Sequence, residues 1–178
     1  MKLFFTGIFL LLSFLSFAQD NQSNAAEPGR QSFYAELGGP GILFSANFDT
    51  RFNKSRTGLG ARIGLGFVSG YIVENNSTYG YLGNPVSVVT FPVQLNYIFG
   101  KPNSVNAFEV GAGITIAGRK LDVFDFYDEN STSIFGTASF MYRRMPKDGG
   151  FSWRAGFTPL ISNGYIQPLG GVSVGYNF

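Results

Sequence analysis

The sequence predicts an all-β chain that folds as a transmembrane, antiparallel up-and-down β-barrel of about eight strands. Three observations lead to this fold class. Charged residues make up 13% of the chain, against roughly 25% in soluble domains, while aromatic residues reach 17%. Beyond the N-terminal region, no run approaches the roughly 18 apolar residues that a spanning helix needs. Alternation of apolar and polar residues with period two runs through most of the chain instead, which is typical of strands.

Residues 1–18 are predicted to be a cleaved signal peptide. Lys2 supplies a positive start, residues 3–15 are apolar, and Ser16-Phe17-Ala18 has the small-x-small pattern of a cleavage site. An uncleaved anchor helix is the alternative, but the apolar stretch is short for one. We expect a mature chain that starts at Gln19, with a flexible periplasmic lead-in over 19–30 and the barrel domain over 31–178.

Most alternating segments have about the ten residues that a tilted strand needs to cross a bilayer. In the segment 58–69, Leu59, Ile63 and Leu65 lie on one face, while Arg62 and several glycines lie on the other. The predicted strands are 31–38, 42–52, 58–69, 87–99, 105–117, 133–144, 151–161 and 170–178.

The bulky face of these strands is predicted to meet lipid, and the Gly-rich polar face to line a crowded interior. An arginine on the lipid face costs about 2–4 kcal/mol at mid-bilayer and about 0–1 kcal/mol near the interface. The strand arginines fall in the polar phase, except Arg144, which lies at a strand end. A soluble lipocalin-like binding barrel, with its apolar faces inward, is a less favoured alternative.

The connections provide a further test of the barrel. Short periplasmic turns and longer outer loops are typical of such barrels. The predicted periplasmic turns are near 53–57, 100–104 and 145–150, and the predicted outer loops are 38–41, 70–86, 118–132 and 162–169. The first outer connection departs from the pattern, because Gly38-Gly39-Pro40-Gly41 has the composition of a tight turn.

Outward-phase aromatic residues gather at the proposed periplasmic ends of the strands. They lie at the starts of upward strands and at the ends of downward strands, as an interfacial girdle requires. These residues are Phe33, Phe52, Tyr97, Phe99, Tyr142, Phe151, Trp153, Tyr176 and Phe178. Pro92 and Pro159 fit less well, because proline cannot donate to a strand ladder, and we expect bulges or local bends at both.

Residues 31–178 resemble the small eight-stranded outer-membrane β-barrels of the OmpA/OmpX-like porin superfamily. The most specific element is the ending Val172-x-Val174-x-Tyr176-x-Phe178, which is similar to the terminal-strand signal read by the barrel-assembly machinery. The resemblance implies export to the outer membrane of a Gram-negative bacterium, with periplasmic chaperones and the assembly machinery as partners during biogenesis. It implies no single activity, because small barrels serve many functions.

Charged residues of the polar phase are predicted to project into the lumen as a network. An eight-stranded barrel is just wide enough for side chains to fill, so these charges must pair. The predicted members are Glu36, Asp49, Arg51, Arg62, Glu109, Arg143 and Arg154. A structural plug of ion pairs is the favoured interpretation, and a switchable gate or narrow polar conduit is the alternative.

The predicted outer loop 118–132 combines acidic and aromatic residues and is a candidate surface-binding loop for an unknown extracellular ligand. Its spacing lacks the glycine and glutamate of an EF-hand loop. The candidate binding residues are Asp122, Phe124, Asp125, Phe126, Tyr127, Asp128 and Glu129. The loop 70–86, rich in Tyr, Asn and Gly, has the composition of an adaptable contact surface.

The absence of His and Cys disfavours an enzyme, since a nucleophile would have to rely on a lone carboxylate or lysine as its base. No cofactor or metal site is predicted. The formal charge of +2 gives no reason to expect nucleic acid. The leading hypothesis is a non-enzymatic outer-membrane protein with a structural or surface-interaction role through loops 70–86 and 118–132. A narrow channel for small solutes or ions is the alternative.

Overall fold

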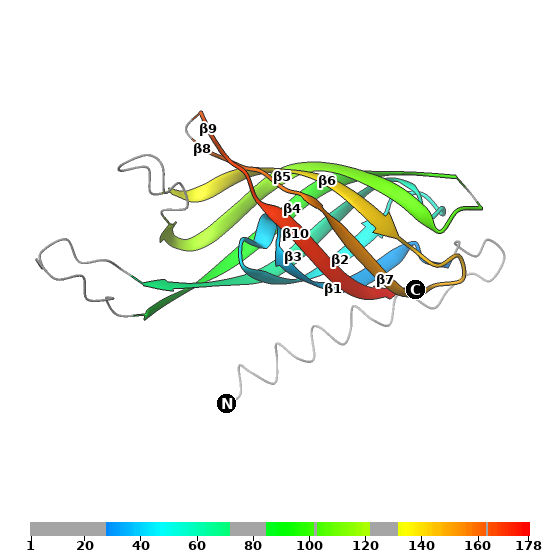
Figure 1. Cartoon of the computed structure of the whole chain (residues 1–178), viewed down its shortest axis with the longest axis horizontal. Coiled ribbons are helices and arrows are strands. Elements are labelled where there is room, and N and C mark those ends of the chain that lie inside the picture. Colours follow the sequence, from blue (N-terminus) through cyan, green and yellow to red (C-terminus); the bar gives the residue numbers. More distant parts are fainter. Residues whose placement is uncertain (1–27, 72–84, 102, 122–131, 163) are drawn as a thin grey trace, which may run out of the picture.

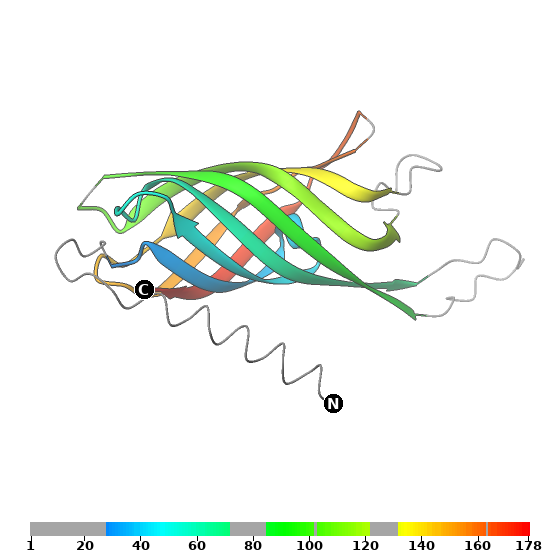
Figure 2. The ribbon, with the colours of Figure 1, turned by 180° about the vertical axis from the view of Figure 1, so that it is seen from behind.

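The computed structural model describes residues 28–71, 85–101, 103–121, 132–162 and 164–178, and these form one antiparallel sheet closed into a barrel (Figures 1 and 2). The first elements are β1 (Gln31–Gly38), the 3₁₀ helix η2 (Gly39–Gly41), β2 (Phe44–Arg51), β3 (Gly58–Tyr71), β4 (Pro85–Gly100) and β5 (Asn106–Leu121). The remaining elements are β6 (Thr132–Arg144), β7 (Gly150–Phe157), β8 (Leu160–Ser162), β9 (Tyr165–Gln167) and β10 (Gly170–Asn177).

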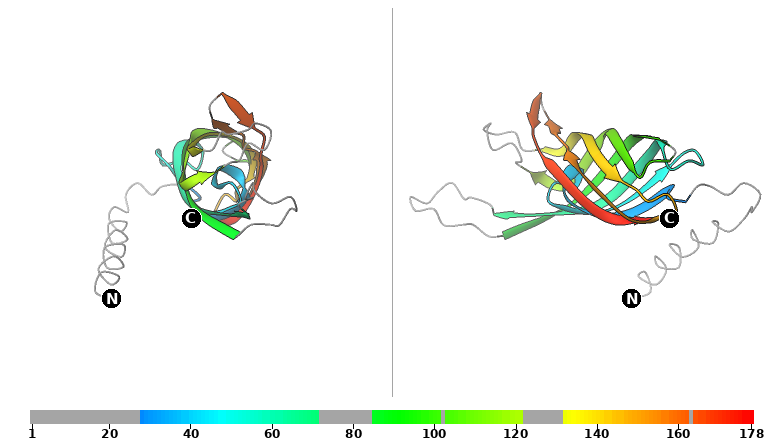
Figure 3. Two further views of the ribbon diagram at one scale, coloured as in Figure 1. Left: turned by 90° about the vertical axis from the view of Figure 1, so that its left-hand side faces the viewer. Right: turned by 45° about the vertical axis from the view of Figure 1, so that its right-hand side comes forward.

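The ten strands act as eight barrel strands. β6 pairs with β7 and then with β8 in one unbroken register, so that Phe140 faces Phe157 and Gly136 faces Ile161. β9 and β10 run back along β8 and β7 in the same way. The pairing of β1 with β10 closes the ring, which Figure 3 shows end-on. The predicted fold class and strand number are confirmed.

The barrel is apolar outside and charged inside. Leu65 and Val174 expose 56% and 54% of their surface, whereas Arg62 and Glu109 expose 1% each. A soluble barrel buries its apolar residues, so this arrangement is the inverse of a lipocalin-like interior. The lipocalin-like interpretation is therefore wrong for the orientation of these strands. No helix in the described part of the chain is long and apolar enough to span a membrane.

Outward aromatic residues form a band at one end of the barrel. Figure 2 shows the C-terminus and the short turns at that end. Phe33, Tyr176 and Phe151 align in one row across three neighbouring strands. Tyr142 packs edge-on against Phe108, with ring centroids 5.7 Å apart, and lies 5.3 Å from the Trp153 ring. The predicted girdle residues thus lie together at one barrel end.

Of the bulges or local bends expected at the two prolines, no β-bulge occurs in the strand pairing. At Pro92 the β3–β4 pairing is interrupted, but Ile63–Val93 and Gly66–Thr90 keep one register on either side. Pro159 separates β7 from β8 without changing their register against β6. The missing N–H therefore removes local strand pairing but leaves the register of the strands unchanged. The register shift that does occur lies between Ile116 and Leu121, where β5 pairs with β6.

Two predicted outer loops differ in the structure. Much of the segment 162–169 extends the sheet as the end of β8 and the strand β9, where Ser162 pairs with Tyr165. The turn 38–41 does not lie on the rim, because Gly39–Gly41 form η2 and are buried. Positive φ angles of 70° at Gly38 and 71° at Gly39 permit this inward turn, since glycine adopts them at little cost.

Several predictions lie outside the described residues. These are the signal peptide at 1–18, most of the lead-in, and the central parts of loops 70–86 and 118–132. The candidate binding residues from Asp122 to Glu129 all fall in this group. β3, β4, β5 and β6 run up to the edges of the two loops.

Candidate functional site

The seven predicted lumen charges lie together in the middle of the barrel, and all of them are buried. They reach the lumen because each occupies the inward phase of its strand, next to neighbours that point outward. β2 carries Asp49 and Arg51, and single residues come from the other strands: Glu36 from β1, Arg62 from β3, Glu109 from β5, Arg143 from β6 and Arg154 from β7.

These side chains form one alternating chain of charges, with an arginine at each end. The order is Arg51, Asp49, Arg143, Glu109, Arg154, Glu36 and Arg62. Every carboxylate in this charge chain lies between two guanidinium groups. Such pairing offsets the large cost of burying charge in an interior of low dielectric constant.

Arg143 and Arg154 are the two bridging arginines of the charge chain. Arg143 Nη1 donates to Asp49 Oδ2 at 2.8 Å and to Glu109 Oε2 at 2.7 Å. Arg154 Nη1 donates to Glu109 Oε2 at 3.1 Å, and Arg154 Nη2 donates to Glu36 Oε1 at 3.3 Å. Asp49 and Arg143 come from β2 and β6, which are not neighbours in the sheet. The charge chain therefore ties the barrel together across its interior.

Neutral groups accept the remaining hydrogen bonds of the two arginines at the ends of the charge chain. Arg51 donates to Asn96 Oδ1 at 2.7 Å and to the Gly58 carbonyl at 3.1 Å. Arg62 donates to the Gln94 amide oxygen and to the Tyr34 hydroxyl at 3.0 Å. Since the charge chain has one more arginine than carboxylates, these oxygens solvate the excess positive charge.

Tyr34 also packs against the charge chain with its ring, whose centroid lies 3.6 Å from Arg154 Cζ. A guanidinium over an aromatic face is attracted by the ring quadrupole. Tyr34, Gln94 and Asn96 were not singled out from the sequence, although all three lie in the inward phase of their strands. Strand phase alone marks these neutral residues as inward-facing.

Glycines make room for the charge chain. Arg51 pairs with Gly60 across β2 and β3, and its guanidinium occupies space that a Cβ at Gly60 would need. A Cβ at Gly113 would come within 2.7 Å of Gln94 Cγ. The Gly-rich inner face is thus the complement of the long side chains that fill the lumen.

An apolar plug lies at the end of the lumen near η2. Val88, Ala117, Phe135 and Leu160 form a buried cluster, and Ile42 packs against it. Two threonines fix η2 itself: Thr115 Oγ1 donates to the Pro40 carbonyl at 2.6 Å, and Thr90 Oγ1 donates to the Gly41 carbonyl at 3.0 Å.

Arg56 links the three short turns by hydrogen bonds at the end of the lumen opposite η2. It comes from the first turn, and it donates to the Ser104 carbonyl of the second at 2.5 Å and to the Met145 carbonyl of the third at 3.3 Å. Met145 is buried there with Ile98 and Ala107. Sequence reasoning missed Arg56, because a turn residue has no place in the alternating pattern.

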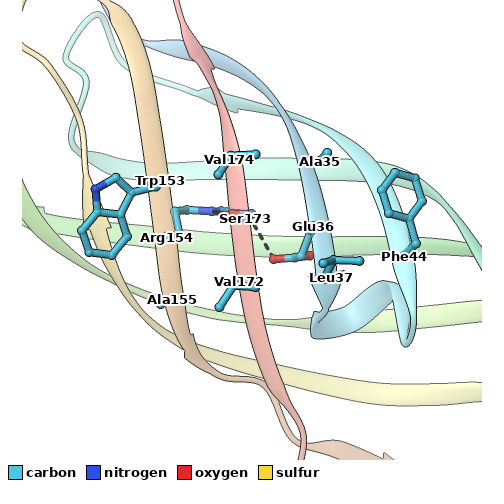
Figure 4. Close-up of a pocket in the computed structure, with 10 residues that line it drawn as sticks. All are labelled: Ala35, Glu36, Leu37, Phe44, Trp153, Arg154, Ala155, Val172, Ser173 and Val174. Atoms are coloured by element: carbon cyan, nitrogen blue, oxygen red, sulfur yellow. Dashed lines mark hydrogen bonds and ion pairs between the residues drawn. The ribbon is translucent and has the colours of Figure 1, made fainter.

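The outer wall carries a hollow of about 550 Å³ over β7, β10 and β1 (Figure 4). Trp153, Val172 and Ala35 line it from the outside, while Arg154 and Glu36 pair behind β10. The hollow is therefore a groove in the apolar face and does not open the lumen. Within the described residues, no cluster of acidic side chains is arranged to hold a metal ion.

The residues of the predicted assembly signal lie on the outer face of the barrel. Val172, Val174 and Tyr176 of β10, and Phe178 just after it, are all exposed. β10 pairs with both β1 and β7 in the closed barrel. Recognition of this segment by an assembly machinery stays a prediction.

The fold and the lumen define a small closed β-barrel with an apolar exterior and a filled interior. Among solved structures, it is similar to the N-terminal β-barrel domain of OprF from Pseudomonas aeruginosa, with a TM-score of 0.52 and 11% identity over 83% of this chain and 95% of that chain. It is also similar to the Yersinia pestis outer membrane protein Ail in a phospholipid bilayer nanodisc, with a TM-score of 0.51 and 13% identity over 84% and 99%.

The chain thus has the fold of small eight-stranded outer-membrane β-barrels, as the sequence predicted. At these identities the likeness concerns the fold. No protein-family model matches the sequence, and no curated protein matches it either.

Proposed function

We propose that this chain is a non-enzymatic outer-membrane protein of a Gram-negative bacterium with a sealed lumen. Its role is structural in the envelope or lies in surface interaction through loops 70–86 and 118–132. The observation that carries the proposal is the charge chain, which fills the middle of the lumen with paired side chains. A lumen filled in this way leaves the loops and the outer wall as the surfaces available for function.

The membrane placement rests on the outer wall. Bulky apolar residues cover the barrel between the aromatic girdle and the opposite rim, and an exposed apolar surface of this extent is unstable in water. Contact with lipid tails would stabilise this apolar surface. The likeness to the outer-membrane protein Ail supports the same placement.

The sealed state rests on three layers along the axis. An ion would have to pass the apolar plug beside η2, the charge chain, and the turns held by Arg56. Each layer is stabilised by different contacts, so no single rotamer change opens all three. We expect near-zero conductance when the folded protein is reconstituted in planar bilayers. Discrete, reproducible conductance steps would contradict the sealed state.

The surface role is tested by replacing residues 73–84 and, separately, 122–131 with short Gly/Ser linkers. Both variants should still insert and migrate as folded barrels on unheated denaturing gels, because the strands remain intact. Adhesion of cells that display the protein should fall for at least one variant. Unchanged adhesion in both would remove the loops from the proposal.

A narrow channel is the second candidate, and buried polar atoms favour it. Glu36 Oε2, Arg62 Nε and Arg143 Nε have no hydrogen-bond partner among the described residues. Waters could satisfy such atoms, and a connected file of waters would carry protons or small ions. Conductance that rises in an Arg143→Ala variant and is already measurable in the wild type would favour this candidate.

The absence of His and Cys supports the non-enzymatic part of the proposal. The buried carboxylates Glu36, Asp49 and Glu109 are each held between arginines, which leaves them poorly placed as general bases.

A further inference from the structure

The rim that carries the three short turns is basic. Lys54 lies in the first turn, Lys101 in the second, and Lys147 in the third, and Arg144 ends β6 beside it. All four side chains are exposed, and none forms an ion pair with a described residue. Asp148, beside Lys147 in the third turn, is the only exposed acidic residue in the described part of the chain, so basic residues outnumber it four to one at this rim.

These four residues form a ring at a defined height on the barrel. Lys54, Lys101 and Arg144 each come two residues after an aromatic residue of the girdle, namely Phe52, Phe99 and Tyr142. Girdle aromatics mark the level of the lipid headgroups. The basic ring therefore lies at the headgroup level or just beyond it, where the phosphates of the bilayer are within reach of long side chains.

Among the four residues of the ring, Arg144 has the most clearly defined orientation toward lipid. It occupies the outward phase of β6 and pairs across the sheet with Trp153 of the girdle. Its guanidinium is thus directed toward the bilayer surface beside the barrel and away from the lumen mouth. Arg56 holds the three turns against each other, which fixes the spacing of the ring.

We propose that the basic ring formed by Lys54, Lys101, Arg144 and Lys147 binds anionic phospholipid headgroups in the leaflet at this end of the barrel. The inference rests on the proposed membrane placement. Charge complementarity and continuity with the girdle favour a lipid over a soluble acidic partner, because the charges encircle the barrel at the interface. The ring would anchor the depth and tilt of the barrel.

The single tryptophan of the chain provides the test. Trp153 lies beside Arg144, so its fluorescence reports which lipids occupy that part of the surface. The full mature barrel is reconstituted in phosphatidylcholine vesicles that contain brominated phosphatidylcholine or brominated phosphatidylglycerol as quencher. We expect phosphatidylglycerol to associate about fivefold more strongly, the factor that one basic residue near an anionic lipid provides.

The preference should disappear in the Arg144→Gln/Lys147→Gln variant. It should also disappear at about 1 M salt, where the Debye length falls to about 3 Å. Arg119→Gln is the matched control, because Arg119 is exposed near the other end of the barrel. The control should keep the preference.

Three results would overturn the inference: equal quenching by both lipids in the wild type, an unchanged preference in the double variant, or an equal loss in the Arg119→Gln control. Quenching by neither lipid would be a different failure. It would show that Trp153 does not face lipid, and it would contradict the proposed membrane placement itself.

Discussion

The inner and outer faces of the barrel wall are built from alternate residues of the same strands, yet they obey opposite rules. On the inner face of β3, Arg62 is 1% exposed and held by polar partners, whereas Ile63 beside it on the outer face is 59% exposed. The inner face is stabilised by specific side-chain contacts. The outer face, in the proposed membrane placement, is stabilised by contact with lipid tails. A change of equal size should therefore have different consequences on the two faces.

The largest effect is expected inside. Glu109→Ala removes the carboxylate shared by Arg143 and Arg154 and leaves two buried cations without it. Loss of one partner from a buried ion pair costs about 3–5 kcal/mol. Urea unfolding of the reconstituted barrel measures the cost, with Glu109→Gln as a control that keeps the shape. A loss under about 1 kcal/mol would show that the charge chain is solvated.

An arginine on the outer face should cost less and depend on depth. Leu65→Arg near the middle of the band should destabilise the barrel by about 2–4 kcal/mol, and Phe99→Arg at the girdle by about 0–1 kcal/mol. Both side chains are exposed, so neither change disturbs a packed interior. Equal costs, measured by the same unfolding experiment in lipid vesicles, would contradict the depth assigned to these residues.

Arg56→Ala tests the lumen end at the short turns. The change removes the hydrogen bonds to the Ser104 and Met145 carbonyls, and bonds from a charged donor contribute about 1.5–3 kcal/mol. Amide hydrogen exchange should accelerate in the three turns while the central strands stay protected. Lys54→Ala, which removes an exposed basic side chain from the same turn, is the comparison. A similar acceleration of exchange in that variant would contradict the role given to Arg56.

A small effect is expected at the apolar plug. Thr115→Val keeps the volume and removes the hydrogen bond to the Pro40 carbonyl, which should cost about 0.5–1.5 kcal/mol. Exchange of the η2 amides should rise in this variant. If η2 stays fully protected, the apolar contacts of the plug hold it without the threonine.

Strand phase explains why much of this architecture could be predicted from the sequence. A period of two assigns every residue of a strand to one face, so Leu65 and Glu109 could be placed without knowing their partners. The strand bounds agree to within a few residues, as at β1, predicted and observed over 31–38. The fold class follows from the same alternation.

Phase does not specify which residues meet across the lumen. The Asp49–Arg143 pair joins residues 94 positions apart on strands that are not neighbours, and it depends on the curvature and stagger of the closed barrel. Arg56 and η2 lie in connections, where no period constrains the chain. The inward fold of Gly39 and Pro40 depends on space left by other strands, which local sequence does not report.

The sealed lumen is tested most directly by cysteine accessibility, because the chain contains no cysteine of its own. Ser139→Cys places a thiol at a fully buried position beside Gln94 in the lumen, and Asn103→Cys places one in an exposed turn. In the folded, reconstituted barrel, a charged water-soluble thiol reagent should modify Asn103→Cys rapidly and leave Ser139→Cys unmodified until the protein is unfolded. Modification of both at similar rates in the folded state would show a water-filled path through the barrel and contradict the account.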